Sequence, residues 1–233
     1  MRIGVFADIH GNIFAFEKVM ESLKKEKLDM YLFCGDICGY YYYQDEVIDV
    51  LKEMDNLKCI AGNHDRFFLE TLKDPSLSMA YEEEYGRSHS LLKNGIKLSS
   101  LEWIKQLPDK WVSGEDELAA FHGSPWDHLN EYIYPDSSFE KFADLSYKYV
   151  ILGHTHHPMD VSIGGVRIIN PGSCGQPRDY NEPSYAVLDT DRDSVTFKRV
   201  KYDVDLMINE VKKRKEKNPR LAEVLQRKVK KSV

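Results

Sequence analysis

The sequence predicts a mixed α/β fold, and three observations support this prediction. In residues 2–61, short apolar runs alternate with amphipathic stretches, as expected for strands joined by helices. Residues 66–108 have helical patterning. From residue 110 onward, β-forming runs dominate, and Gly164-Gly165 indicates a hairpin turn between two of them. The chain therefore combines a strand–helix half with a strand-rich half.

The expected elements follow in chain order. Helices are expected over 12–27 and 45–54, because their apolar residues recur at helical spacing on one face. A short helix is expected over 137–145, and helical spacing returns after residue 203. Apolar runs flanked by turn residues predict strands at 2–7, 30–34, 58–61, 110–113, 117–121, 148–152, 159–163, 166–169, 184–189 and 194–201.

The expected domain organisation is one domain with a C-terminal extension. The domain covers residues 1–202 and contains a helical insertion at 66–108, and a basic helical tail covers 203–233. Residues 212–231 hold ten Lys or Arg and two Glu, so this segment carries +8 while the whole chain carries −6. A basic tail can follow the phosphates of a nucleic acid, or it can be the solvated face of terminal helices. The sequence leaves both interpretations open.

The composition is that of an ordinary globular protein. Apolar residues make up 42% and charged residues 30% of the 233 positions, which excludes an intrinsically disordered chain. No apolar run approaches the roughly 20 residues that cross a bilayer, and the chain enters a strand-like run at Ile3 without a basic leader segment. The four cysteines match neither a zinc pattern nor a disulfide framework. We therefore expect reduced thiols, a cytoplasmic location and no membrane partner.

Five of the expected strands end in polar residues that can bind metal ions. At the carboxyl ends of strands in an α/β sheet, neighbouring loops converge on a common crevice. The ligand types are carboxylate, amide and imidazole without thiolate, which suits Mn, Fe, Zn or Co rather than Ca. Asp-x-His and His-x-His spacings would place alternate side chains on one side of an extended segment. The residues concerned are Asp8, His10, Asp36, Asn63, His122, His154 and His156.

The order of these motifs resembles that of the calcineurin-like metallophosphoesterases. The matching motifs are Asp-x-His, Gly-Asp, Gly-Asn-His-Asp, His-Gly and Gly-His-Thr-His, and segments 122–125 and 170–178 match as well. The resemblance covers about residues 1–200. It looks closest to a small prokaryotic branch of predicted phosphodiesterases and diadenosine tetraphosphatase-like enzymes. It implies a four-layer α/β/β/α sandwich of two mixed β-sheets.

The resemblance also implies a dinuclear metal centre and a role for each ligand. Manganese is the first expectation for both ions, with Fe, Zn, Ni or Co as alternatives. A hydroxide shared by the two metals would attack phosphorus in line, which suits ions about 3.5–4 Å apart. The implied ligands are Asp8, His10 and His156 for one metal, Asn63, His122 and His154 for the other, and Asp36 as the bridge.

Four further residues have expected roles around the metals. His64 resembles the general acid that protonates the leaving oxygen, or else a donor to the phosphoryl group, and Asp65 would orient or charge its imidazole. Arg178 is expected to clamp a phosphate, the alternative being an ordinary salt-bridged surface arginine. Asn12 is expected either to donate to substrate or only to cap the first helix.

The sequence departs from the protein phosphatases of this superfamily after the Gly-Asp motif. Those enzymes continue with Asp-Arg-Gly, whereas this chain lacks the arginine and continues with Ile37-Cys38-Gly39 and then Tyr40–Tyr43. The tyrosine rings, and the ring of Trp126, could stack on a nucleobase. Alternatively, they could pack under the insertion or at a dimer contact.

The expected function is hydrolysis of a small phosphodiester or a dinucleoside polyphosphate. A phosphomonoesterase is the alternative within enzymes, and a nuclease or a non-catalytic scaffold of the same fold are further alternatives. A scaffold would lack metal ligands, and none of the expected ligands is missing from this sequence. The expected partner is a small phosphoester and not nucleic acid, and a homodimer is left open.

Overall fold

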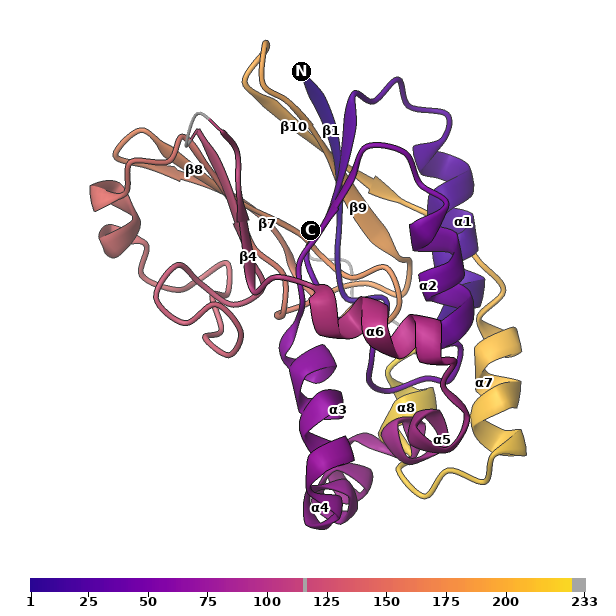
Figure 1. Cartoon of the computed structure of the whole chain (residues 1–233). Coiled ribbons are helices and arrows are strands. Elements are labelled where there is room, and N and C mark those ends of the chain that lie inside the picture. The colour runs from indigo at the N-terminus through magenta and orange to yellow at the C-terminus, as the bar shows by residue number, and fades with distance from the viewer. Residues whose placement is uncertain (115–116, 228–233) are drawn as a thin grey trace.

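Two five-stranded mixed β-sheets, packed face to face, form the centre of the protein (Figure 1). The computed structural model describes residues 1–114 and 117–227 of the chain. The first sheet has the order β10 (Ser194–Arg199), β9 (Ser184–Asp189), β1 (Arg2–Phe6), β2 (Met30–Phe33) and β3 (Leu57–Cys59). The second sheet has the order β4 (Lys110–Val112), β5 (Leu118–Phe121), β6 (Tyr149–Ile151), β8 (Val166–Pro171) and β7 (Pro158–Ile163).

Each sheet contains three neighbouring parallel strands, which lie at one side of the first sheet and in the middle of the second. In the first sheet β1, β2 and β3 are parallel, and β9 and β10 continue the sheet on the other side of β1 as antiparallel strands. In the second sheet β5, β6 and β8 are parallel, with β4 and β7 as antiparallel edges. The loops that follow the parallel strands therefore all leave their sheet at the carboxyl ends of those strands.

Apolar side chains fill the space between the sheets and the outer face of the first sheet. Val5 and Leu32 from the first sheet and Ile151 from the second belong to one fully buried cluster. On the outer face of the first sheet, α1 (Ile13–Leu23) and α2 (Gln44–Lys52) bury their apolar faces, as their helical spacing predicts. The predicted four-layer sandwich of two mixed sheets is confirmed.

The outer layer on the second sheet differs in detail from the expected one. An α-helix over 137–145 is the expectation, but the structure has a short 3₁₀ helix at Glu140–Asp144, whose Phe142 packs beneath the sheet. The hydroxyl of Ser137 accepts a hydrogen bond from the N–H of Tyr134 at 2.9 Å. Such a local bond holds the backbone in a turn where an α-helix would have to begin.

The chain crosses from the first sheet to the second through four helices, which are α3 (Asn63–Lys73), α4 (Pro75–Tyr85), α5 (Ser88–Gly95) and α6 (Leu98–Gln106). This helical segment begins earlier than expected, so His64 and Asp65 lie in the first turn of α3. The break before α4 falls at Asp74, whose carboxylate accepts from the N–H of Ser76 at 2.9 Å, with Pro75 in the first turn. In Figure 1, α3 and α4 project below the sheets.

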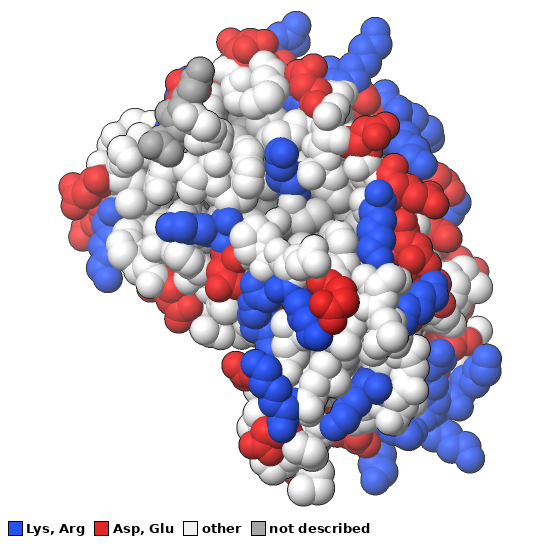
Figure 2. Space-filling view, in the orientation of Figure 1, with Lys and Arg blue, Asp and Glu red and all other residues white. Residues whose placement is uncertain are grey.

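The C-terminal tail packs back onto the domain. α7 (Val204–Lys213) contacts α1 and buries Met207 and Val211, and α8 (Arg220–Glu223) follows it. Figure 2 shows Lys and Arg side chains gathered at the lower right, over α7. Residues 228–233 of the expected basic tail lie outside the described residues. No helix within the described ranges is long and apolar enough to cross a membrane.

Candidate metal centre

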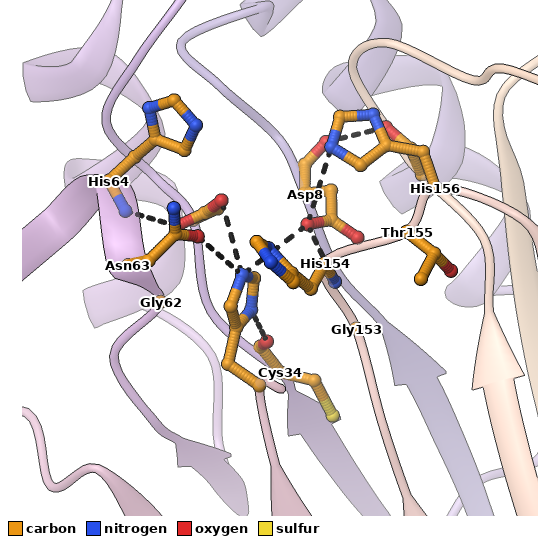
Figure 3. A network of polar contacts seen from close by, with 12 residues as sticks. Asp8, Cys34, Gly62, Asn63, His64, Gly153, His154, Thr155 and His156 are labelled. Atoms are coloured by element: carbon orange, nitrogen blue, oxygen red, sulfur yellow. Dashed lines mark hydrogen bonds and ion pairs between the residues drawn. The ribbon is translucent and has the colours of Figure 1, made fainter. Parts of the chain in front are cut away.

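The loops that carry the expected ligands all follow parallel strands. After β1, β2, β3, β5 and β6 come, in that order, Asp8 with His10, then Asp36, Asn63, His122, and His154 with His156. Because parallel strands end at the same edge of a sheet, and the two sheets are packed together, these loops meet at one edge of the sandwich (Figure 3). The structure brings all seven residues together.

One group of ligands consists of Asp8, His10 and His156. Their ligand atoms lie within 4.8 Å of one another, and all three side chains are buried. His10 Nε2 and His156 Nε2 are 3.1 Å apart, and Asp8 Oδ1 is 3.6 Å from His156 Nε2. We call these residues cluster 1.

A second group, cluster 2, consists of Asp36, His122 and His154, with Asn63 beside them. The ligand atoms of the first three lie within 4.8 Å of one another, and Asn63 Oδ1 is 3.0 Å from His122 Nε2. Asp36 Oδ2 is 3.2 Å from His122 Nε2 and 3.6 Å from His10 Nε2 of cluster 1. This one carboxylate oxygen therefore lies between the two clusters, which is the position a bridging ligand takes.

Backbone carbonyls set the orientation of the four imidazole rings. The ring Nδ1 of His10, His122 and His156 lies 2.7, 2.7 and 2.6 Å from the carbonyl oxygens of Cys38, Cys34 and Gln176, respectively. A carbonyl oxygen only accepts, so these Nδ1 atoms donate, and the lone pair of each neutral ring is on Nε2, facing the clusters. His154 is reversed, because its Nε2 donates to Asn130 O at 3.2 Å and leaves Nδ1 for a ligand role.

The polar atoms at the centre fit divalent cations. Asp8 Oδ2 and Asp36 Oδ2 are buried without a hydrogen-bond partner among the described residues. Burial raises the pKa of Asp8 to about 8 and lowers the pKa of His10 well below its usual range. For His122, burial lowers the pKa, but the nearby Asp36 carboxylate outweighs this and raises the pKa to about 9. Unpartnered carboxylate oxygens beside imidazole nitrogens are the donor set that Mn, Fe, Zn, Ni and Co accept.

The backbone of the ligand loops differs from the extended form expected for Asp-x-His and His-x-His spacing. Five ligands have left-handed backbone conformations, with φ between 51° and 68°: Asp8, His10, Asp36, His154 and His156. Non-glycine residues adopt this region at a cost of about 1–3 kcal/mol each, which the surrounding structure must offset. Two backbone hydrogen bonds help to offset this cost. Asp8 N–H donates to Gly35 O at 2.9 Å, and His10 N–H donates to Asp36 O at 3.0 Å. The expected extended backbone is therefore not found, although Asp8 and His10 do reach one cluster, as their spacing predicts.

Glycine is required where β3 leads into α3. A Cβ on Gly62 would lie 2.0 Å from Asp36 Oδ1, closer than any real contact. The absence of a side chain lets the start of α3 approach Asp36, and the N–H of His64 then donates to Asp36 Oδ1 at 2.9 Å. The N-terminus of α3 thus stabilises the carboxylate that lies between the clusters.

His64 lies beside cluster 1, but Asp65 does not orient its ring. The Nδ1 of His64 is 2.6 Å from the hydroxyl of Tyr81, which comes from α4. Both carboxylate oxygens of Asp65 instead accept from backbone N–H groups, at 2.8–3.1 Å, of Asp36, Ile37, Cys38 and Gly62. The expected role of Asp65 is therefore corrected. Its position in the first turn of α3 turns the carboxylate back toward the helix start and the β2 loop, so that it holds the loop of Asp36.

Two tyrosines near the ligands were missed by reasoning from sequence. Tyr81 is buried and stacks on His89, with ring centroids 3.6 Å apart and an interplanar angle of 8°. Tyr132 is half exposed, and its ring centroid lies 3.8 Å from that of His154. Tyr81 has only the helical spacing of an ordinary packing residue. Tyr132 lies in an irregular loop, so neither residue has a motif that could have revealed it.

Asn12 caps the first helix, and its side chain has no group left for a substrate. Its Oδ1 accepts from the N–H of Ala15 at 3.2 Å, and Nδ2 donates to Gly175 O at 2.7 Å and to the hydroxyl of Tyr202 at 3.3 Å. The side chain is fully buried. Of the two expected roles, the cap is the one found, and the substrate contact is corrected.

Arg178 lies at the edge of the metal centre, in the loop between β8 and β9. Its guanidinium donates to the hydroxyl of Tyr40 at 2.9 Å. The salt bridges between described residues do not include Arg178, so the alternative of an ordinary salt-bridged arginine is not what the structure shows. Arg178, Tyr40 and Tyr132 line a cavity of about 380 Å³.

The other aromatic residues that were considered for stacking lie elsewhere. Tyr41 and Tyr42 contact the C-terminal tail, where their hydroxyls donate to Leu221 O and Glu216 Oε1, each at 3.0 Å. Trp126 packs on Phe142 at 4.9 Å between ring centroids, in the outer layer of the second sheet. Tyr41 and Tyr42 thus pack under the tail, rather than under the insertion.

A two-sheet sandwich with carboxylate, amide and imidazole groups converging at one edge defines the class of metallophosphoesterases. A model of the calcineurin-like phosphoesterase superfamily domain matches residues 1–193. The chain therefore belongs to the calcineurin-like phosphoesterase superfamily, as the motif resemblance predicts. Membership supports a phosphoester hydrolase.

Three known proteins illustrate the similarity. An uncharacterized protein of Methanocaldococcus jannaschii is 29% identical over 224 residues, which cover 87% of this chain and 88% of the relative. The crystal structure of a metallophosphoesterase from Sphaerobacter thermophilus has a TM-score of 0.81 at 25% identity, covering 97% of this chain and 99% of that one. A hypothetical protein of Pyrococcus horikoshii has a TM-score of 0.86 at 22% identity, with coverages of 96% and 97%.

Proposed function

We propose that this protein hydrolyses a small phosphodiester or a dinucleoside polyphosphate with two divalent metal ions, manganese first among them. The observation that carries the proposal is the position of Asp36 Oδ2, between cluster 1 and cluster 2. When bound by the seven ligands, the two cations would neutralise phosphoryl charge and lower the pKa of water. Fe, Zn, Ni and Co suit the same donors.

The surroundings of His64 support a role in proton transfer to the substrate. His64, Asn63 and His154 line one cavity of about 330 Å³, so a phosphoryl group beside cluster 2 would also be beside His64. Because Tyr81 engages Nδ1, the ring atom that remains for a substrate oxygen is Nε2. We infer that His64 protonates the leaving oxygen.

The surroundings of this cavity favour a diester over a monoester. A site for a monoester dianion usually surrounds it with several cationic side chains, but Arg66 is engaged by Asp109, with Nε donating to Oδ1 at 2.6 Å. The described residues that line this cavity include no Lys or Arg, and the guanidinium of Arg178, which lines the adjoining space, contacts no carboxylate among the described residues. Tyr85 and Tyr132 line the cavity and could carry the second substituent of a diester.

A comparison of matched substrates tests this proposal. On the manganese-loaded protein, we expect bis-p-nitrophenyl phosphate to have a higher kcat/KM than p-nitrophenyl phosphate. Replacing Arg178 with Ala should lower kcat/KM by the equivalent of about 1.5–3 kcal/mol, the value of a charged hydrogen bond. If the monoester is hydrolysed tenfold faster, a phosphomonoesterase replaces this proposal. If neither ester is hydrolysed with any of the five metals, phosphoester hydrolysis itself is contradicted.

We also propose a cytoplasmic location. All four cysteines are free, and three of them are buried. Free thiols are typical of proteins in a reducing compartment. Fractionation of cells that express the chain tests this, and recovery in the culture medium would contradict it.

A further inference from the structure

A second cavity adjoins the cavity that contains His64. It has a volume of about 380 Å³, and the two cavities share Glu84, Tyr85 and Tyr132 as lining residues. Its lining also includes Arg178 and Tyr40, which are joined by the hydrogen bond of 2.9 Å. A ligand larger than one phosphoryl group could therefore extend from the metal centre into this space.

The second cavity has more positive than negative charge. Arg178 comes from the loop between β8 and β9, whereas Arg220 and Arg227 come from the C-terminal tail. Glu84 is the one carboxylate among the described lining residues. The arginine salt bridges between described residues involve other arginines, so these three guanidinium groups are not neutralised by carboxylates there.

Buried contacts hold the tail arginines at this cavity. Leu221 and Leu225 are only 2% and 4% exposed, in an apolar cluster that includes Tyr41. The hydroxyl of Tyr41 also donates to Leu221 O at 3.0 Å. Arg220 directly precedes Leu221, so its backbone is anchored. Such anchoring reduces the entropy that would be lost when a ligand binds.

We propose that this second cavity binds the additional phosphates of a polyphosphate-bridged substrate, while the phosphoryl group to be hydrolysed lies beside His64. We call it the tail subsite, consisting of Arg178, Arg220 and Arg227 with Tyr40 and Tyr132. A guanidinium matches two phosphoryl oxygens at once, and the rings can carry a base. The proposal rests on the proposed function and narrows it to dinucleoside polyphosphates. A cavity of about 380 Å³ has the size of small-molecule sites rather than of a groove for a nucleic-acid strand.

The test removes the tail arginines and compares two substrates. We expect Arg220→Gln/Arg227→Gln to lower kcat/KM for diadenosine tetraphosphate by about 100-fold, because two charged hydrogen bonds are lost. For bis-p-nitrophenyl phosphate, which has no further phosphate, the change should be less than about twofold. The control, Lys212→Gln/Lys213→Gln, removes the same charge from the exposed end of α7, outside the lining. It should change neither substrate by more than about twofold.

Calorimetry provides a readout that does not depend on turnover. A hydrolysis-resistant, methylene-bridged analogue of diadenosine tetraphosphate should bind the arginine double variant about 100-fold more weakly than the unaltered protein. Equal affinities, or an equal loss in the lysine control, would overturn the tail subsite. A single-stranded oligonucleotide that displaces the analogue at equal concentration would overturn it as well, in favour of a nucleic-acid surface. In each case, hydrolysis of bis-p-nitrophenyl phosphate would still support the proposed function. Failure to hydrolyse either nitrophenyl ester would contradict that function, while the binding measurements would still report on the tail subsite.

Discussion

The metal-ligand loops and the wall around them use side chains in different ways. In the loops, ligands such as His10 and His122 are fully buried, and backbone carbonyls fix their rings. The wall consists of α4, the loop that carries Tyr132, and the C-terminal tail. Its side chains are more exposed: Tyr132 is 49% exposed, and Arg220 is exposed as well. If the proposed function holds, the loops determine which ions bind, and the wall determines which substrates reach them. Substitutions in the loops should remove metal, whereas substitutions in the wall should alter rates with the metal retained.

The largest effect should come from the carboxylate shared by both clusters. Asp36→Asn should lower the content of both metal ions and abolish most hydrolysis, because Asp36 Oδ2 lies near ligands of cluster 1 and of cluster 2. Metal analysis and turnover of bis-p-nitrophenyl phosphate measure this, with the exposed Asp55→Asn as the control. Chelation of the unaltered protein should have the same effect, and manganese should reverse it. Full activity after exhaustive chelation would disprove the metal centre.

The next largest effect is expected at His64, where a substitution should lower the rate without removing metal. His64→Ala should lower kcat by about 10²–10⁴ while leaving metal content nearly intact. The loss of kcat should be smaller for substrates that release nitrophenolate, because this leaving group needs little protonation. Rates measured across leaving groups of different pKa test this. A uniform loss would indicate that His64 stabilises the phosphoryl group, and a loss of metal would make His64 a ligand.

A substitution of Tyr81 should have a smaller effect, because Tyr81 acts through the imidazole of His64. Tyr81→Phe removes the hydroxyl 2.6 Å from His64 Nδ1 and should lower kcat about tenfold, the value of one positioning hydrogen bond, with little change in KM. Nitrogen NMR of His64 should show a changed ring environment. The control is Tyr149→Phe, whose hydroxyl bonds Asp193 in another part of the molecule. If Tyr81→Phe lowers only thermal stability, Tyr81 is a packing residue.

The smallest effect is expected where the tail docks. Tyr41→Phe removes the hydrogen bond to Leu221 O and should lower the free energy of unfolding by about 1 kcal/mol. Thermal or urea unfolding measures this. Hydrolysis of bis-p-nitrophenyl phosphate should be nearly unchanged, because Tyr41 does not line the cavity at His64. A large loss of activity would show that the tail supports the metal centre directly.

Some expectations could not have been corrected from the sequence. Asp65 follows His64 directly, so a contact between them is a natural expectation, but the first turn of α3 points the carboxylate toward the N–H groups of Ile37 and Cys38. Asn12 has an amide oxygen that can accept from a helix N–H as a cap, and an amide nitrogen that can donate to a substrate. That its amide nitrogen is not free for a substrate became evident only from the bonds to Gly175 O and the hydroxyl of Tyr202, which are far away in the chain.

The sequence by itself determined the alternation of strands and helices, the strand ends at which the metal ligands lie, and the chemical type of those ligands. Apolar periodicity and glycine-flanked polar motifs are local, so they can be read along the chain. Only the tertiary structure decided that Tyr81 engages His64, and that Arg220 joins Arg178 at one cavity. These contacts join segments that are distant in the chain, and their geometry depends on how helices pack on the sheets, which no local pattern records.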